Sequence, residues 1–118
     1  MLKPVLALLT AATVAGGALF HAELKSSLPA ANSTVTAPKA ITLTFTEAVT
    51  LRLSGISIYD AKNTALVQKL VVQAKGDTVV WGPVTKPLVP GKYTVRWKNG
   101  AADDGHPESG TFVFTVTK

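Results

Sequence analysis

The sequence has no cysteine and only one methionine, Met1. A chain without cysteine forms no disulfide, offers no thiolate to a metal ion and carries no lipid on an N-terminal cysteine. Its folded state must therefore be stabilised by a hydrophobic core rather than by a covalent cross-link. Any metal site in the mature chain has to be assembled from nitrogen and oxygen donors.

Clustered positive charge is also lacking, although 12 basic residues outnumber 7 acidic ones and give a formal net charge of +5. The lysines are spread along the chain and form no basic stripe with interleaved aromatic side chains. Such scattering is typical of a solvated surface. We therefore expect no nucleic acid as a partner.

A membrane-spanning run is lacking as well. Residues 5–18 are mostly apolar, but two threonines and a Gly-Gly pair interrupt them, and a spanning helix needs roughly 20 apolar residues. Lys3 precedes this run and a polar sequence follows it, which is the layout of a secretory signal peptide. We predict residues 1–20 as a cleaved signal peptide, and a mature chain without a membrane anchor.

The position of the cleavage site stays open between two alternatives. The small residues Gly16-Gly17-Ala18 fit the rule for the position before the cut, and cleavage there leaves two residues ahead of His21. Cleavage after Phe20 fits this rule poorly, yet it makes His21 the first residue. Residues 21–118 are about one domain in size, and their net charge falls from +5 to +4 when Lys3 is lost.

After the leader, short β-rich runs alternate with clusters of Pro, Gly, Asn and Asp, and no stretch shows a sustained 3.6-residue apolar period. This pattern predicts an all-β sandwich or small barrel. Seven strands are expected, which is the number in a small immunoglobulin-like sandwich. The predicted strands are residues 22–26, 40–46, 55–59, 65–72, 77–82, 92–98 and 111–117.

The predicted core consists of three rows in which apolar residues alternate with polar ones, as half-buried strands require. A tyrosine also follows the turn at Pro90-Gly91. In Greek-key sandwiches a tyrosine at this place donates its hydroxyl hydrogen bond to the backbone a few residues upstream, so Tyr93 is expected to have a structural role. The three rows are Ile41, Leu43 and Phe45; Tyr93, Val95 and Trp97; and Phe112, Phe114 and Val116.

The chain has two histidines, and each has a place in a candidate metal site. If His21 is the first residue, its α-amine and imidazole can chelate one ion, because a strong Lewis acid displaces the amine proton near neutral pH. Asp104 and His106, two positions apart, face the same side if their segment is extended. Such nitrogen and oxygen donors suit Cu(II) better than Zn(II) or Cu(I). The alternative is that His106 is an ordinary polar loop residue, which is the commoner case for a single histidine.

Several segments, taken in order, are similar to one known family. Together they resemble the CopC family of periplasmic copper-binding proteins, whose mature N-terminus typically reads HAxLxxSxPA. The resemblance spans almost all of residues 21–118 and implies a Greek-key β-sandwich. The segments are HAELKSSLPA at 21–30, LTFTE at 43–47, YTVRW at 93–97, DGHP at 104–107 and GTFVF at 110–114.

The resemblance implies one Cu(II) per chain, held by the amine and imidazole of His21 and by Asp104 and His106. It also implies a periplasmic copper carrier or store, acting in copper resistance or homeostasis with a CopD-type inner-membrane partner. We expect a monomer. Some members of the family bind Cu(I) in a methionine-rich loop, but Met1 leaves with the leader, so no methionine site is expected here.

A second aspartate competes for the role of ligand. The segment between Trp97 and the Asp-x-His element is about one residue longer than the family pattern. Asp103 is therefore an alternative to Asp104. The two-residue offset from His106 favours Asp104.

Two other functions are alternatives to a copper carrier. A histidine-brace copper oxidase also uses an N-terminal histidine with a second histidine, but an aspartate ligand occupies a position that oxygen needs. A metal-free immunoglobulin-like structural module is the other alternative. No serine lies beside a histidine or an acid in a nucleophile motif, so the chain is not expected to be an enzyme.

Overall fold

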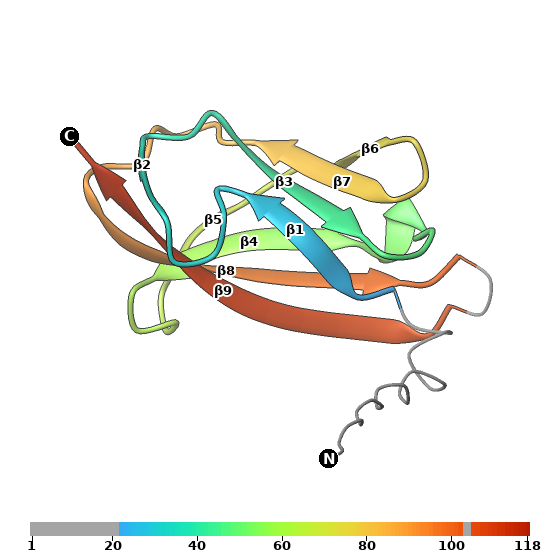
Figure 1. The fold of residues 1–118 in the computed structure, drawn as a ribbon. Helices are drawn as coiled ribbons and strands as arrows, with labels where there is room; N and C mark the ends of the chain where they lie inside the picture. Colours follow the sequence, from blue (N-terminus) through green and yellow to red (C-terminus); the bar gives the residue numbers. More distant parts are fainter. Residues whose placement is uncertain (1–21, 103–104) are drawn as a thin grey trace, which may run out of the picture.

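Two β-sheets face each other in the computed structural model, which describes residues 22–102 and 105–118 (Figure 1). One sheet has four strands in the order β1-β3-β7-β6, and the other has five in the order β2-β9-β8-β4-β5. A short 3-10 helix, η2, spans Leu51–Leu53. The strands are β1 (Leu24–Leu28), β2 (Thr34–Thr36), β3 (Ala40–Phe45), β4 (Gly55–Asp60), β5 (Leu66–Lys69), β6 (Gln73–Lys75), β7 (Val79–Pro83), β8 (Gly91–Gly100) and β9 (Pro107–Thr117).

The predicted all-β sandwich is confirmed, and each of the seven predicted strands is present with somewhat different ends. The structure adds two strands of three residues each. β2 pairs with β9 and is the one parallel strand among the named pairs, while β6 lies at the edge of the four-stranded sheet beside β7. All three residues of β6 are exposed, so no alternation of apolar and polar residues marks it in the sequence.

The three predicted core rows are all buried, with at most 9% of any of their nine residues exposed. The rows come from β3 in one sheet and from β8 and β9 in the other. Phe45 and Trp97 join the sheets through an edge-to-face contact, with ring centroids 5.4 Å apart. Burying a large apolar side chain contributes about 1.5–3 kcal/mol, so these rows stabilise the sandwich without any covalent link.

The tyrosine prediction is also confirmed. The Tyr93 hydroxyl donates a hydrogen bond to the carbonyl oxygen of Val89 at 2.6 Å. The ring packs beside Phe114, with centroids 5.9 Å apart. Tyr93 therefore has a structural role at one end of the sandwich.

The longest pairing in the molecule is the β8–β9 hairpin. Its register runs from Gly91 opposite Val116 to Gly100 opposite Pro107, so the loop after Gly100 lies at the end of the sandwich away from Tyr93. Figure 1 shows the first residues of β1 at this same end. The fold thus brings the start of the described chain beside the hairpin loop.

No helix within residues 22–102 and 105–118 is long and apolar enough to cross a membrane.

Candidate metal centre

Backbone hydrogen bonds hold the described part of the β8–β9 loop. The Gly105 amide donates to the carbonyl of Ala101 at 2.7 Å, and the Ala101 amide donates to the carbonyl of His106 at 3.1 Å. The Ala102 amide donates to the carbonyl of Ala48 at 2.9 Å, which ties the loop to the segment after β3. Gly105 has φ +69°, a left-handed conformation that glycine adopts at little cost. The loop therefore presents the residue after Gly105 from a fixed backbone.

His106 follows Gly105 and keeps an accessible side chain, 46% exposed. Its Nε2 atom lies 3.7 Å from Oε2 of Glu108, the second residue of β9, whose side chain is 25% exposed. This distance is long for a hydrogen bond, but it allows an ion pair when the imidazole is protonated. An imidazole and a carboxylate are both suitable ligands or supports for a divalent metal.

Glu108 is a candidate functional residue that the sequence interpretation missed. Side chains two positions apart on an extended strand point to the same face. The spacing of His106 and Glu108 therefore extends the Asp-x-His pattern by one further polar residue. This spacing was the signal that could have identified Glu108.

A buried amide joins the start of the described chain to this hairpin. The Asn99 Nδ2 atom donates to the carbonyl oxygen of Ala22 at 3.0 Å, across 77 positions of sequence. Ala22 is fully buried, and 2% of Asn99 is exposed. Asn99 lies opposite Glu108 in the strand register, so the contact with Ala22 is made at the end of the hairpin that carries His106.

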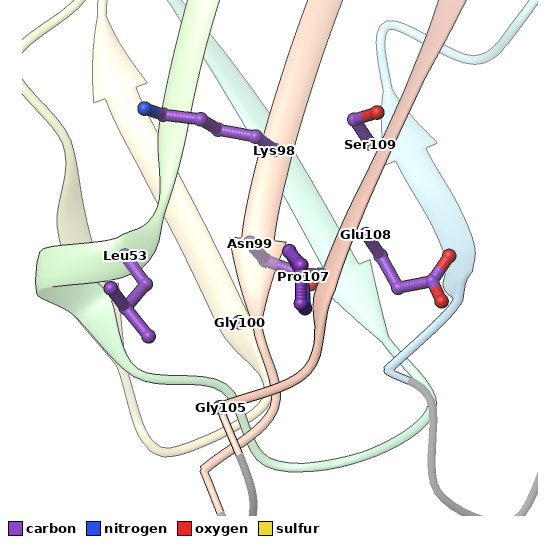
Figure 2. A pocket seen from close by; sticks show the side chains of 8 residues that line it. All are labelled: Leu53, Lys98, Asn99, Gly100, Gly105, Pro107, Glu108 and Ser109. Atoms are coloured by element: carbon purple, nitrogen blue, oxygen red, sulfur yellow. The ribbon is translucent and has the colours of Figure 1, made fainter.

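Beside this hydrogen bond lies an open pocket of about 520 Å³ (Figure 2). Figure 2 shows that β8, β9 and η2 contribute to its wall, with Leu53 and the Glu108 carboxylate on opposite sides of β9. The pocket leaves the loop end of the hairpin open to a ligand or partner. Its lining residues are Leu53, Lys98, Asn99, Gly100, Gly105, Pro107, Glu108 and Ser109.

The structure describes one of the predicted ligands, His106. His21, Asp104 and the alternative Asp103 lie outside the described residues, so their roles stay predictions. Within the described ranges, no three His, Cys, Asp or Glu side chains form a group that could hold a metal ion. The described part of the site thus consists of His106 with Glu108 and the Asn99–Ala22 contact.

Known proteins resemble this chain over almost its whole length. Protein YobA of Escherichia coli K12 is 40% identical over 119 residues, which cover 98% of this chain and 94% of YobA. Copper resistance protein C of Escherichia coli is 37% identical over 111 residues, covering 87% of this chain and 86% of that protein.

Two solved structures share the fold. CopC from Methylosinus trichosporium OB3b superposes with a TM-score of 0.74 at 29% identity, covering 81% of this chain and 93% of that one. PcoC, a methionine-rich copper resistance protein from Escherichia coli, gives 0.69 at 32% identity, with 82% and 99% covered. The CopC domain family model matches residues 24–117. The described chain from β1 to the last residue of β9 is therefore a CopC domain, and the protein belongs to the CopC family.

Proposed function

We propose that the protein is a periplasmic copper-binding protein that carries or stores one Cu(II) ion in copper resistance or homeostasis. In this proposal residues 1–20 are removed on export, and the ligands are the amine and imidazole of His21 with Asp104 and His106. Relatives named copper resistance protein C support a copper-related function.

The hydrogen bond from Asn99 to Ala22 is the observation that carries the proposal. Residue 21 is covalently bonded to Ala22, and Ala22 is tied at 3.0 Å to the strand that leads into the His106 loop. A site that draws ligands from both segments needs them at the same end of the sandwich. The buried contact supports such a site, because it holds Ala22 against β8 near the His106 loop.

The donor set determines which copper ion suits the site. Two nitrogens from one residue close a chelate ring, and a carboxylate with a second imidazole completes a tetragonal arrangement favoured by Cu(II). One relative is described as methionine-rich, whereas the single methionine here is Met1. The proposal therefore includes no methionine-type Cu(I) site.

The proposed site supports a role in transport rather than in catalysis. A carrier needs a ligand set that an acceptor can displace stepwise, and His106 at 46% exposure can be reached by an incoming donor. We propose a monomer that exchanges copper with a CopD-type inner-membrane protein. No nucleophile or general base is needed for this exchange.

The proposal is tested by exporting the full chain, measuring the intact mass of the secreted product and titrating it with Cu(II) against a competing chelator. We expect a mass that begins at His21 and one tightly bound ion per chain. Loss of a supporting residue around a metal typically costs 10–100-fold in affinity, so His106→Ala, which removes a ligand, should weaken binding by more than about 100-fold.

Lys92→Ala serves as the matched control, because Lys92 is exposed on β8 at the opposite end of the hairpin. It should bind copper as the wild type does. Equal binding by wild type and His106→Ala would contradict the proposed site. A mass that retains Leu19 and Phe20 would eliminate the amine chelate.

A further inference from the structure

A groove of about 380 Å³ lies on the outer face of the five-stranded sheet, over β4, β5 and β8. The two small residues Gly55 and Ser57 of β4 form its floor. They alternate with the buried residues Ile56 and Ile58, so positions 55 and 57 face away from the core. The neighbouring strands contribute longer side chains, which rise on both sides of this floor.

Three basic side chains surround the floor of the groove. In the strand register Ser57 lies between Lys69 of β5 and Arg96 of β8, and Lys98 lies opposite Gly55. Figure 2 shows Lys98 reaching from β8 across β4. A Cβ atom on Gly55 would lie only 3.1 Å from Cε of this lysine. The absence of a side chain at position 55 therefore leaves room for Lys98 to lie across the strand.

The positive charge is not balanced within the groove, because no carboxylate is among the described residues that line it. The partners of the half-buried Arg96 are neutral. Its Nε and Nη2 atoms donate to the side-chain oxygen and the carbonyl oxygen of Asn63, each at 2.7 Å. Its Cζ atom lies 3.6 Å from the centre of the Tyr59 ring. A charge that is partly removed from water is normally paired with an opposite charge, so the groove is complementary to an anion.

The shape of the groove favours carboxylates on a polypeptide over a nucleic acid. Asn63 and Tyr59 hold the planar guanidinium of Arg96 in place, and its remaining N–H groups suit a carboxylate. Single-stranded nucleic acids bind largely by stacking bases on aromatic rings, but Arg96 already covers one face of Tyr59. Leu66, 55% exposed, also lines the groove and offers a contact for an aliphatic side chain.

We propose that this groove is a docking site for an acidic segment of a partner protein. Carboxylates of the segment accept hydrogen bonds from Arg96 and Lys98, and an aliphatic side chain packs against Leu66. Lys98 also lines the pocket beside the His106 loop, so the docked partner lies next to that end of the sandwich. Charge complementarity of this kind mainly increases the association rate and selects the partner. The groove itself needs no metal ion, so its test does not depend on the proposed function.

The probe is a short fluorescent peptide in which glutamates surround one leucine, and its control has glutamine in place of each glutamate. Fluorescence anisotropy measures binding to the exported protein, free of copper, at low and at physiological salt. Amide chemical shifts of the isotope-labelled protein show where the peptide binds. Oligothymidine and vesicles that contain an anionic lipid are the competing anions.

Lys98→Glu should weaken peptide binding by at least about 10-fold, because it replaces an attraction with a repulsion. Arg96→Gln removes charged hydrogen-bond donors and should also weaken binding by about 10-fold. Lys92→Glu is the matched control, since Lys92 is exposed on the same face of β8. It lies about 13 Å from Arg96 along the strand, beyond the screening length of about 8 Å at physiological salt. This variant should bind the peptide as the wild type does.

Equal losses in Lys98→Glu and Lys92→Glu would overturn the inference, because only the net charge would then matter. Chemical shifts that change outside the groove, or equally tight binding of the glutamine peptide, would overturn it as well. Tighter binding of oligothymidine or vesicles to the same residues would overturn the assignment to a protein segment. If Arg96→Gln does not fold, the exposed Lys98 decides through Lys98→Glu. Failure of the proposed function would appear separately, as copper binding that does not depend on His106.

Discussion

Two buried amide side chains lie in the described part of the sandwich, and they differ in how completely they are hydrogen-bonded. Gln68 on β5 donates to the Lys86 carbonyl at 2.8 Å and accepts from the Thr85 amide at 3.1 Å. Asn99 on β8 donates to Ala22 and leaves its oxygen without a partner in the described part of the chain. Gln68 therefore ties β5 to the segment before β8, whereas Asn99 departs from the usual full pairing of buried polar groups.

The same contrast extends to the two ends of the sandwich. At the end with Gln68, the Tyr93 hydroxyl and the Asp60 carboxylate both have backbone partners within a few residues. At the other end, the exposed His106 imidazole and the Glu108 carboxylate lie beside an open pocket. At the Gln68 end, polar side chains are hydrogen-bonded to nearby backbone. At the His106 end, polar side chains lie beside an open pocket that a ligand could enter.

The largest expected effect acts on both ends, because it removes a side chain from the single hydrophobic core that lies between them. Phe114 is fully buried in the shared core, and Phe114→Ala should lower the free energy of unfolding by about 3–5 kcal/mol. Urea denaturation measures this loss. Hydrogen exchange should increase at both ends together, and an increase confined to one end would show that the ends are not coupled through this core.

A smaller effect should appear at the metal end alone. Carboxylates near metal-bound imidazoles orient the ring, so Glu108→Gln should weaken Cu(II) binding by roughly 10-fold. Stability should change by no more than about 0.5 kcal/mol, because Glu108 is partly exposed. Chelator competition and thermal unfolding of one sample measure both quantities. Unchanged Cu(II) affinity would show that Glu108 lies near His106 without orienting its ring for the metal.

The converse change should affect the other end alone. Tyr93→Phe removes the hydroxyl that donates to the Val89 carbonyl, which can then accept a hydrogen bond from water. The free energy of unfolding should therefore fall by about 1 kcal/mol. Copper affinity should stay at the wild-type value. A change in copper binding in this variant would contradict the separation of the two ends.

The smallest effect depends on pH. Hydrogen bonds from the backbone amides of Thr64 and Ala65 hold the pKa of Asp60 below its usual value of 3.8. A lowered pKa in the folded state means that the stabilising contribution is present above pH 3.8 and lost as the pH falls below it. Asp60→Asn should therefore melt slightly below wild type at pH 7, and the difference should shrink in acid. A difference independent of pH would assign the effect to packing.

Much of the fold could be predicted because the core residues alternate with polar ones. The rows on β3, β8 and β9 have apolar side chains at every second position, and all of them are buried. The short strand β2 was missed because three residues give too little alternation. Strand ends were less accurate: the predicted strand at 65–72 ends at Lys69, and the predicted strand at 92–98 continues to Gly100.

Asn99 illustrates that last error. It occupies the next inward position after Tyr93, Val95 and Trp97, but the predicted strand ended at residue 98. In the structure β8 continues to Gly100, and Asn99 is as buried as the apolar residues before it. Sequence patterns that exclude polar residues from the core therefore miss the residues that a functional site places there.

The candidate site could be predicted only through the histidines and the family motifs. Spacing along the chain cannot reveal that Ala22 and Asn99 share a hydrogen bond, because 77 positions separate them. That contact depends on how the two sheets pack. Glu108 could have been predicted more easily, since its two-residue offset from His106 is visible in the sequence.

The direction of β9 has a practical consequence for handling the protein. β9 starts beside His106 and carries the chain to the opposite end of the sandwich, where Thr117 is exposed (Figure 1). An affinity tag or fluorescent reporter fused after Lys118 would therefore leave the end that carries His106 unobstructed. In the proposed copper site, anything fused directly ahead of residue 21 would instead cap the amine that chelates the ion.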